Sequence, residues 1–142
     1  MAEEFPKKIT TFLKEHHVIT IATCKDSQPW CFNAFYVFDE ETQAFIFTSH
    51  NDTRHVQEAL KNATVAGSVV LETSNVAKVQ GLQFTGEMHL CEGSQETRAN
   101  KLYIKRFPFA TLAPKTLWQI EIVTAKMTDN TLGFGKKLTW ER

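Results

Sequence analysis

Trp30-Cys31-Phe32-Asn33-Ala34-Phe35-Tyr36-Val37-Phe38 is the stretch of sequence that decides the fold of this chain. In an extended strand, successive side chains point to opposite faces of the sheet. One face here would carry Trp30, Phe32, Ala34, Tyr36 and Phe38, and the other would carry Cys31, Asn33, Phe35 and Val37. Both sets are mostly apolar, which is typical of a strand that is covered on both sides. The sequence therefore predicts a central strand over Trp30–Phe38.

Further short strands, separated by turn residues, lie on either side of this segment. We predict them at His17–Lys25, Ala44–Ser49, Val65–Glu72, Ala77–Cys91 and Leu117–Met127, with a short terminal strand over Lys136–Glu141. Gly81 and Gly86 mark expected bulges or bends in the long fifth strand. Strands joined by short turns pair antiparallel, and six of them with this apolar content close most economically as a small barrel.

Three helices are expected around the barrel. The first has Pro6 near its start and carries Phe5, Ile9, Phe12, Leu13 and His16 at helical spacing. The second covers Asp52–Lys61, with Val56 and Leu60 at i, i+4, and the third covers Ser94–Arg106, with Ala99, Leu102 and Tyr103 facing inward. Thr128–Gly135 is expected to be irregular. The fold class is therefore mainly β (α+β), with short flanking helices.

Length and composition restrict the function. The 142 residues suit a single domain spanning 1–142, and 42% hydrophobic with 23% charged residues is ordinary globular composition. Sixteen basic residues balance sixteen acidic ones, whereas a general nucleic-acid binder needs a basic surplus. No apolar run is long enough to span a bilayer, and Met1–Lys8 lacks the apolar core of a signal peptide. Three cysteines without a Cys-x-x-Cys pair suit a reducing cytoplasm.

The segment Phe47-Thr48-Ser49-His50-Asn51-Asp52-Thr53-Arg54-His55 is the most informative for chemistry. A strand ends there in two hydroxyl residues, and a helix begins a few positions later. Free N–H groups at a helix start, neighbouring hydroxyls and an arginine together can hold a phosphate group. The alternative is structural: Asn51, Asp52 and Thr53 merely cap the helix, and Arg54 lies in solvent. The segment alone leaves both interpretations open.

Other chemical signals are weak. The five histidines and three cysteines have no metal-ligand spacing, and neither a serine nucleophile elbow nor a catalytic carboxylate pair is visible. We therefore predict neither a metal site nor a dedicated catalytic side chain. Lys136 and Lys137 follow Gly133-Phe134-Gly135, which is not a phosphate-binding P-loop. Such a lysine pair lies in solvent unless the fold brings it to a phosphate.

The order of elements resembles the pyridoxamine phosphate oxidase-like, FMN-binding split-barrel superfamily. Within it, the chain is most similar to the bacterial YhbP-like proteins. Segments along nearly the whole chain carry the resemblance: Trp30–Tyr36, Thr53-Arg54-His55, Arg106-Phe107-Pro108 and Thr128–Lys137. It implies a six-stranded antiparallel split β-barrel that forms a homodimer, with FMN in a groove at the dimer interface.

The resemblance also implies which residues bind the cofactor. Asn33, Ala34 and Phe35 would run along the isoalloxazine ring. Thr48, Ser49, Thr53 and Arg54 would hold the phosphate, together with His55, which occupies a position where the oxidases have lysine. Gln80 lies beside Gly81, which replaces a flavin-contacting glutamine, and Lys136 or Lys137 replaces an arginine of the oxidases' tail. These departures argue against oxidation of pyridoxamine phosphate itself.

Two functional hypotheses follow. The first is an FMN-dependent oxidoreductase acting on a small molecule, in which the flavin supplies the electron chemistry and no side chain need be catalytic. The second is a non-catalytic flavin- or ligand-binding dimer, such as a cofactor buffer, a sensor or an interaction module. The sequence names neither the substrate nor the electron donor.

Overall fold

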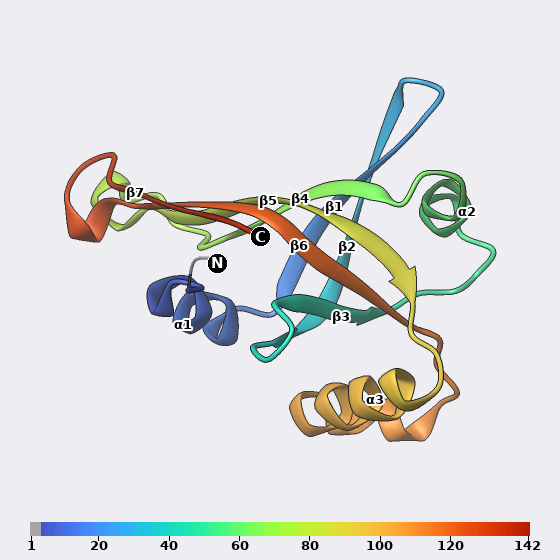
Figure 1. Ribbon diagram of the computed structural model, residues 1–142. Helices are drawn as coiled ribbons and strands as arrows, with labels where there is room; N and C mark the ends of the chain where they lie inside the picture. Colours follow the sequence, from blue (N-terminus) through green and yellow to red (C-terminus); the bar gives the residue numbers. More distant parts are fainter. Residues whose placement is uncertain (1–3) are drawn as a thin grey trace.

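Seven antiparallel strands form one sheet in the computed structural model, which describes residues 4–142 (Figure 1). The strands are β1 (Val18–Lys25), β2 (Gln28–Asp39), β3 (Ala44–Thr48), β4 (Thr64–Val70), β5 (Gln80–Leu90), β6 (Leu117–Asp129) and β7 (Lys137–Glu141). Their order is β3-β2-β1-β4-β5-β6-β7, and β3 also pairs with β6. This pairing closes β1 to β6 into a ring, so the predicted six-stranded antiparallel split barrel is confirmed.

β6 is shared between the ring and the terminal strand. Its first part pairs with β3, from Leu117 to Glu121, and its last part pairs with β7, from Thr124 to Thr128. The change of partner accompanies a register shift against β5 between Thr85 and Gly86. A Cβ atom at Gly86 would lie 2.5 Å from the carbonyl oxygen of Glu121, so only glycine fits there. The predicted bulge at Gly86 is confirmed.

The helices lie on the outside of the ring. They are α1 (Lys7–Glu15), α2 (Arg54–Lys61) and α3 (Ser94–Arg106), with single 3₁₀ turns at Val76–Lys78, Pro108–Leu112 and Asn130–Leu132. α1 buries Ile9, Phe12 and Leu13 against the main core. α3 buries Ala99 and Tyr103 in a second apolar cluster with Phe107 and Leu117. The three predicted helices are therefore confirmed.

The core inside the ring comes from alternate residues of every strand. Its largest buried side chains are Ile19, Ile21, Tyr36, Phe45, Phe47, Leu82, Met88, Ile120, Ile122 and Met127. Removing apolar surface of this extent from water is the main term that stabilises such a fold. The ring is thereby a rigid support for the loops at its ends.

Some predicted boundaries were wrong. β5 begins at Gln80 rather than Ala77, because Asn75 accepts a hydrogen bond from Ala77 N (3.0 Å) and starts a 3₁₀ turn. Gly81 is regularly paired with Val70 and Thr128, so no bulge lies there. β6 continues to Asp129 through residues expected to be irregular. Finally, Leu60 of α2 is exposed, and Glu58 is buried instead.

β2 is central, as predicted, since it pairs with both β1 and β3. The expectation that it is covered on both sides is wrong for a single chain. Phe35 is 52% exposed and Cys31 and Asn33 are exposed, so much of one face of β2 is uncovered by the described residues, although Val37 on the same face packs against the second apolar cluster. Its first half also projects with β1 beyond the ring, as a hairpin (Figure 1). Residues Asp26 and Ser27, both at positive φ, form the hairpin's tight turn.

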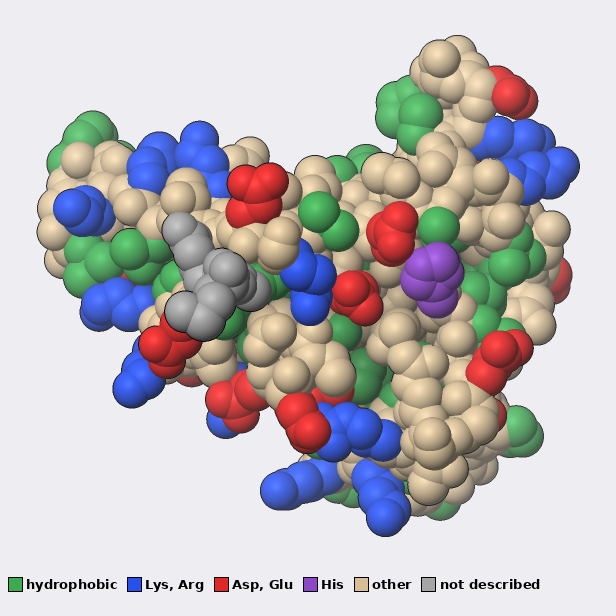
Figure 2. Space-filling model, viewed as in Figure 1, with side chains coloured by type: hydrophobic (Ala, Val, Ile, Leu, Met, Phe, Trp, Pro, Cys, Tyr) green, Lys and Arg blue, Asp and Glu red, His purple; other side chains and the backbone are tan. Residues whose placement is uncertain are grey.

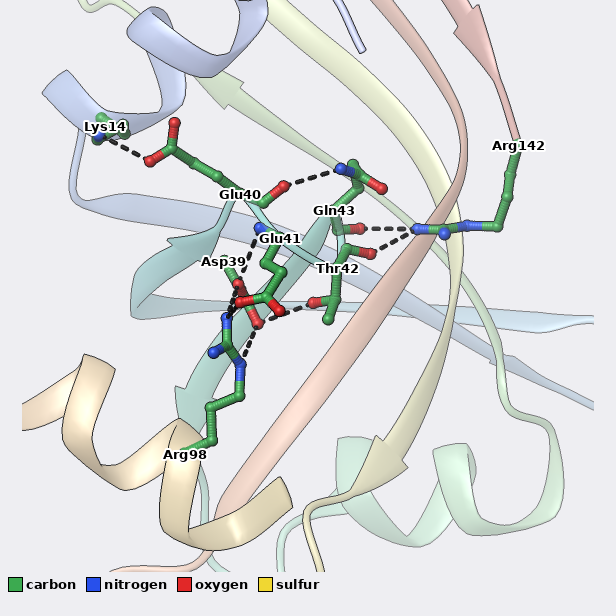
Figure 3. A network of polar contacts seen from close by, with 8 residues as sticks. All are labelled: Lys14, Asp39, Glu40, Glu41, Thr42, Gln43, Arg98 and Arg142. Atoms are coloured by element: carbon green, nitrogen blue, oxygen red, sulfur yellow. Dashed lines mark hydrogen bonds and ion pairs between the residues drawn. The ribbon is translucent and has the colours of Figure 1, made fainter. Parts of the chain in front are cut away.

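The turn between β2 and β3 is fixed by a polar network (Figure 3). The carboxylate of buried Asp39 accepts hydrogen bonds from Arg98 of α3 (2.6 and 3.2 Å) and from the hydroxyl of Thr42 (2.8 Å). From the other side, Arg142 donates to the carbonyl oxygens of Thr42 (2.9 Å) and Gln43 (3.1 Å). The network therefore joins α3 and residue 142 to one turn of the ring.

Charged side chains of both signs are mixed over the face shown in Figure 2, with hydrophobic side chains in scattered places. No helix within residues 4–142 has the length and apolar character needed to cross a membrane. The signal-peptide expectation rests partly on Met1–Glu3, which lie outside the described residues.

Candidate functional site

The link from β3 to α2 brings the predicted phosphate-binding residues together. Thr48 ends β3, Ser49 follows it, and Thr53 is the N-cap of α2, accepting a hydrogen bond from Val56 N (3.4 Å). The Thr53 hydroxyl also donates to the carbonyl oxygen of His50 (2.8 Å). Arg54 and His55 are the first two residues of the helix. The capping interpretation thus holds for Thr53, but it does not leave Arg54 alone in solvent.

Ser49 and His55 form a close polar pair. Ser49 Oγ lies 2.5 Å from His55 Nε2, and the imidazole stacks on Phe32 with 3.5 Å between ring centroids and 8° between planes. Burial lowers the pKa of His55 below its ordinary value, so the ring is neutral at pH 7. Trp118 fixes the other side of Ser49 by donating its indole N–H to the Ser49 carbonyl oxygen (3.2 Å). This pair supplies hydrogen bonds to the site, and no charge.

Arg54 carries the positive charge of the site. Its Nε donates to Glu58 Oε2 (2.7 Å), and its guanidinium carbon lies 4.1 Å from the centroid of the Trp30 ring. Among the described residues, neither terminal nitrogen of Arg54 has a hydrogen-bond acceptor. Those two nitrogens form the fork that binds phosphate or carboxylate oxygens in a bidentate way.

Four residues of this neighbourhood were missed by sequence reasoning: Thr23, Trp30, Phe32 and Glu58. The spacing of Arg54 and Glu58 at i, i+4 on one helix was a readable sign of their ion pair. The stacking of Trp30 on Arg54 and of Phe32 on His55 could not be read, because it depends on how the β1–β2 hairpin packs against α2.

A cavity of about 410 Å³ lies beside the link from β3 to α2, and neither Arg54 nor His55 is among the residues that line it. One wall of the cavity is formed by Thr48, Ser49, His50 and Thr53. The opposite wall comes from α3 and the segment after it, with Tyr103, Phe109, Ala110, Ala113, Pro114, Lys115 and Thr116. The lining combines apolar side chains with several hydroxyl groups, the imidazole of His50 and the ammonium group of Lys115, which suits a small organic ligand.

The residues predicted to run along the ring of the cofactor lie on β2. The amide oxygen of Asn33 accepts a hydrogen bond from the hydroxyl of Thr20 (2.7 Å) on the neighbouring strand. Phe35 packs on Phe107, with ring centroids 5.6 Å apart. Ala34 points to the opposite face of the strand, where it packs against the core. Asn33 and Phe35 therefore share the uncovered face of β2, and Ala34 can offer only its backbone to it.

The remaining predicted residues lie far from this site within one chain. Gln80 begins β5, where it borders a hollow beside Lys7, Lys8 and Thr11 of α1. Lys136 and Lys137 lie at the β6–β7 connection, at the opposite end of the molecule from α2 (Figure 1). One chain therefore does not bring these three residues to Arg54.

No group of three or more His, Cys, Asp or Glu side chains in the described part of the chain is arranged to hold a metal ion.

The chain matches known proteins over nearly its whole length. Residues 5–129 match the family described as Pyridoxamine 5'-phosphate oxidase. The UPF0306 protein YhbP of Salmonella arizonae is 42% identical over 134 residues, which are 94% of this chain and 91% of that protein.

Solved structures of low sequence identity share the fold. The heme storage protein HutZ of Vibrio cholerae has a TM-score of 0.68 at 16% identity, and the match covers 84% of this chain and 91% of the HutZ chain. A FAD-binding protein of Mesorhizobium loti has a TM-score of 0.70 at 13% identity, and the match covers 87% of this chain and 93% of the chain of that protein. The match to the family and the 42% identity together show that this chain belongs to the pyridoxamine 5'-phosphate oxidase family, and to its UPF0306 group.

Proposed function

We propose that this protein binds FMN at the interface of a homodimer and uses it to oxidise or reduce a small molecule. Family membership supports a flavin, and one structural neighbour is named as FAD-binding. The observation that carries the proposal is the free fork of Arg54. It lies at the start of α2, next to the hydroxyl of Ser49 and the imidazole of His55.

These residues fit the phosphate group of FMN. Arg54 would bind two phosphate oxygens, and the start of α2 adds backbone N–H groups that favour an anion. Ser49 and His55 would add hydrogen bonds. When bound, FMN itself would supply the electron chemistry. The cavity bordered by Thr48 and Tyr103 would hold the small-molecule reactant.

A second copy of the chain would complete the site. Gln80, Lys136 and Lys137 lie far from Arg54 within one chain, so in this proposal a partner related by a two-fold axis supplies them. The uncovered sheet face supports such an interface, because Val18 is 50%, Phe35 52% and Val70 64% exposed on neighbouring strands. Exposed apolar side chains gathered on one face are typical of an interaction surface.

A non-catalytic role is the second candidate, and the charges of the site favour it. The neutral His55 replaces a positive charge, and Glu58 offsets the charge of Arg54. A site with so little net charge would release FMN readily, as a cofactor buffer or sensor must. We place either function in the cytoplasm, where the three free cysteines would stay reduced.

The absorbance spectrum of the purified protein tests the cofactor. Flavin bands are expected, and a Soret band without them would instead indicate heme, as in the heme storage neighbour. Bleaching of the flavin bands by NADH or NADPH, followed by reoxidation with an added acceptor, would support the enzyme. Bound flavin that no reductant bleaches would favour the buffer or sensor.

A further inference from the structure

Arg54 is held by residues from three different elements. In the register of the β1–β2 hairpin, Thr23 lies directly opposite Trp30. Thr23 contacts Glu58, and Trp30 contacts Arg54. Arg54 and Glu58 are four residues apart on α2 and form an ion pair. The two paired residues of the hairpin therefore contact the two paired residues of the helix, one to one. We call Thr23, Trp30 and Glu58 the Arg54 clamp.

The clamp fixes one edge and one face of the guanidinium group. Glu58 Oε2 accepts from Arg54 Nε at 2.7 Å, and Glu58 Oε1 accepts from the Thr23 hydroxyl at 3.0 Å. The Trp30 ring covers one face of the group at 4.1 Å. The guanidinium is planar, so these contacts leave its terminal fork in one orientation. These contacts use only Nε of Arg54, so its two terminal nitrogens remain available to a ligand.

Two residues of the clamp, Thr23 and Glu58, are buried. Thr23 is 1% exposed and Glu58 is 7% exposed, although Glu58 carries a charge. A buried carboxylate is costly unless it is paired and hydrogen-bonded. The hydrogen bond from Arg54, helped by that from Thr23, outweighs burial and lowers the pKa of Glu58. Glu58 therefore remains charged at neutral pH and stays paired with Arg54.

We propose that Glu58 and Thr23 are positioning residues, which aim the fork of Arg54 at the phosphate group of the bound cofactor. The inference rests on the proposed function, since it assumes that Arg54 binds phosphate. It adds that the affinity for phosphate depends on two residues that do not touch it. Preorganisation of this kind strengthens binding because less side-chain freedom is lost when the ligand arrives.

Glu58 also has an opposite effect, because its negative charge repels a phosphate dianion. Two variants separate the effects. Glu58→Gln removes the charge together with the strong acceptor, whereas Thr23→Val removes only a hydroxyl group and changes no charge. Positioning predicts that Thr23→Val weakens phosphate binding, and simple repulsion predicts that it has no effect.

The experiment titrates full-length protein, freed of bound flavin, with FMN and with riboflavin, which lacks the phosphate. We expect Thr23→Val and Glu58→Gln each to weaken FMN binding by about three- to tenfold, with a change of less than about twofold for riboflavin. Thr23→Ser, which keeps the hydroxyl, should bind FMN like the wild type. Thr97→Val is the matched control, because Thr97 is exposed on α3 and bonds only to Gly93 O (3.4 Å).

A second readout follows Arg54 without any ligand. The NMR signal of its Nε–H group, identified by its loss in Arg54→Ala, should exchange slowly with water in the wild type and faster in Thr23→Val. Unchanged exchange and unchanged FMN affinity in Thr23→Val would overturn the inference. A wild type that binds FMN no better than riboflavin would contradict the phosphate assignment of the proposed function itself.

Discussion

At the scale of single residues, Arg54 carries the charge of the proposed phosphate site. Arg54→Ala should weaken FMN binding by about ten- to hundredfold, because a hydrogen bond to a charged group contributes about 1.5–3 kcal/mol. Riboflavin binding should change little. Titration by flavin fluorescence quenching measures both affinities. Equal losses for the two ligands would place Arg54 outside the phosphate site and leave it a helix-surface residue.

His55 makes a second residue-scale prediction, which concerns pH. Burial lowers the pKa of His55 in the free protein, so the ring is neutral there near pH 7. A bound phosphate dianion would raise that pKa, and linkage then requires FMN to bind more tightly as pH falls from about 7.5 towards about 6.5. The second ionisation of phosphate, near pH 6, opposes the trend below that range.

His55→Lys tests this pH dependence directly. Lysine stays charged across the range, so the variant should bind FMN more tightly than the wild type at about pH 8 and lose the dependence. FMN titrations of both proteins between about pH 6.5 and 8 provide the measurement. A flat wild-type profile, or a variant no tighter at the alkaline end, would remove His55 from the site.

At the scale of elements, the sequence predicted what periodicity and turn residues encode. The strand over Trp30–Phe38 and the three helices follow from local patterns, and the structure confirms them. The start of β5 was missed because one side-chain hydrogen bond of Asn75 decides it. Resemblance gave Arg54 and His55, but their neighbours Trp30 and Phe32 depend on the packing of the hairpin on α2. Contacts between elements of this kind leave no periodic trace in the sequence.

The turn between β2 and β3 gives an element-scale prediction about acid stability. Burial raises the pKa of Asp39, but hydrogen bonds from Arg98 and Thr42 outweigh it and hold the pKa below its usual value. The carboxylate is therefore stabilised more in the folded than in the unfolded chain. This contribution is present above the unfolded pKa, near 3.9, and is lost as pH falls through the lower folded pKa.

Asp39→Asn should reduce the free energy of unfolding by about 1–3 kcal/mol at pH 7, since a buried charged hydrogen-bond acceptor is lost. The difference from the wild type should shrink in strong acid. Urea unfolding at neutral and acid pH measures it. Glu40→Gln is the control, because the Lys14–Glu40 ion pair (2.9 Å) in the same turn is exposed and should contribute under about 1 kcal/mol. An equal effect of the two substitutions would contradict the role given to Asp39.

At the scale of the whole molecule, the uncovered sheet face predicts self-association. Val70→Asp places a charge on that face and should shift the protein from dimer towards monomer, because burying an unpaired charge is costly. Sedimentation equilibrium at micromolar protein measures the mass. Leu60→Asp is the control, since Leu60 is 61% exposed but lies on α2. A wild type with the mass of one chain under all conditions would contradict the dimer.

The two ends of the molecule make the sharpest prediction, because they assign residues of one site to different chains. α2, which begins at Arg54, lies at one end, and β7, which begins at Lys137, lies at the other (Figure 1). If a site takes Arg54 from one chain and the lysines from its partner, a mixed dimer of Arg54→Ala with Lys136→Ala/Lys137→Ala has one intact site and one doubly damaged site. Random exchange of subunits should then restore tight FMN binding in about a quarter of all sites. If each site were built from a single chain, every site in a mixed dimer would still lack either Arg54 or the two lysines. Mixing the variants would then restore no tight FMN binding. Unfolding and refolding the two variants together, with each variant refolded alone as a control, distinguishes the two arrangements in one FMN titration.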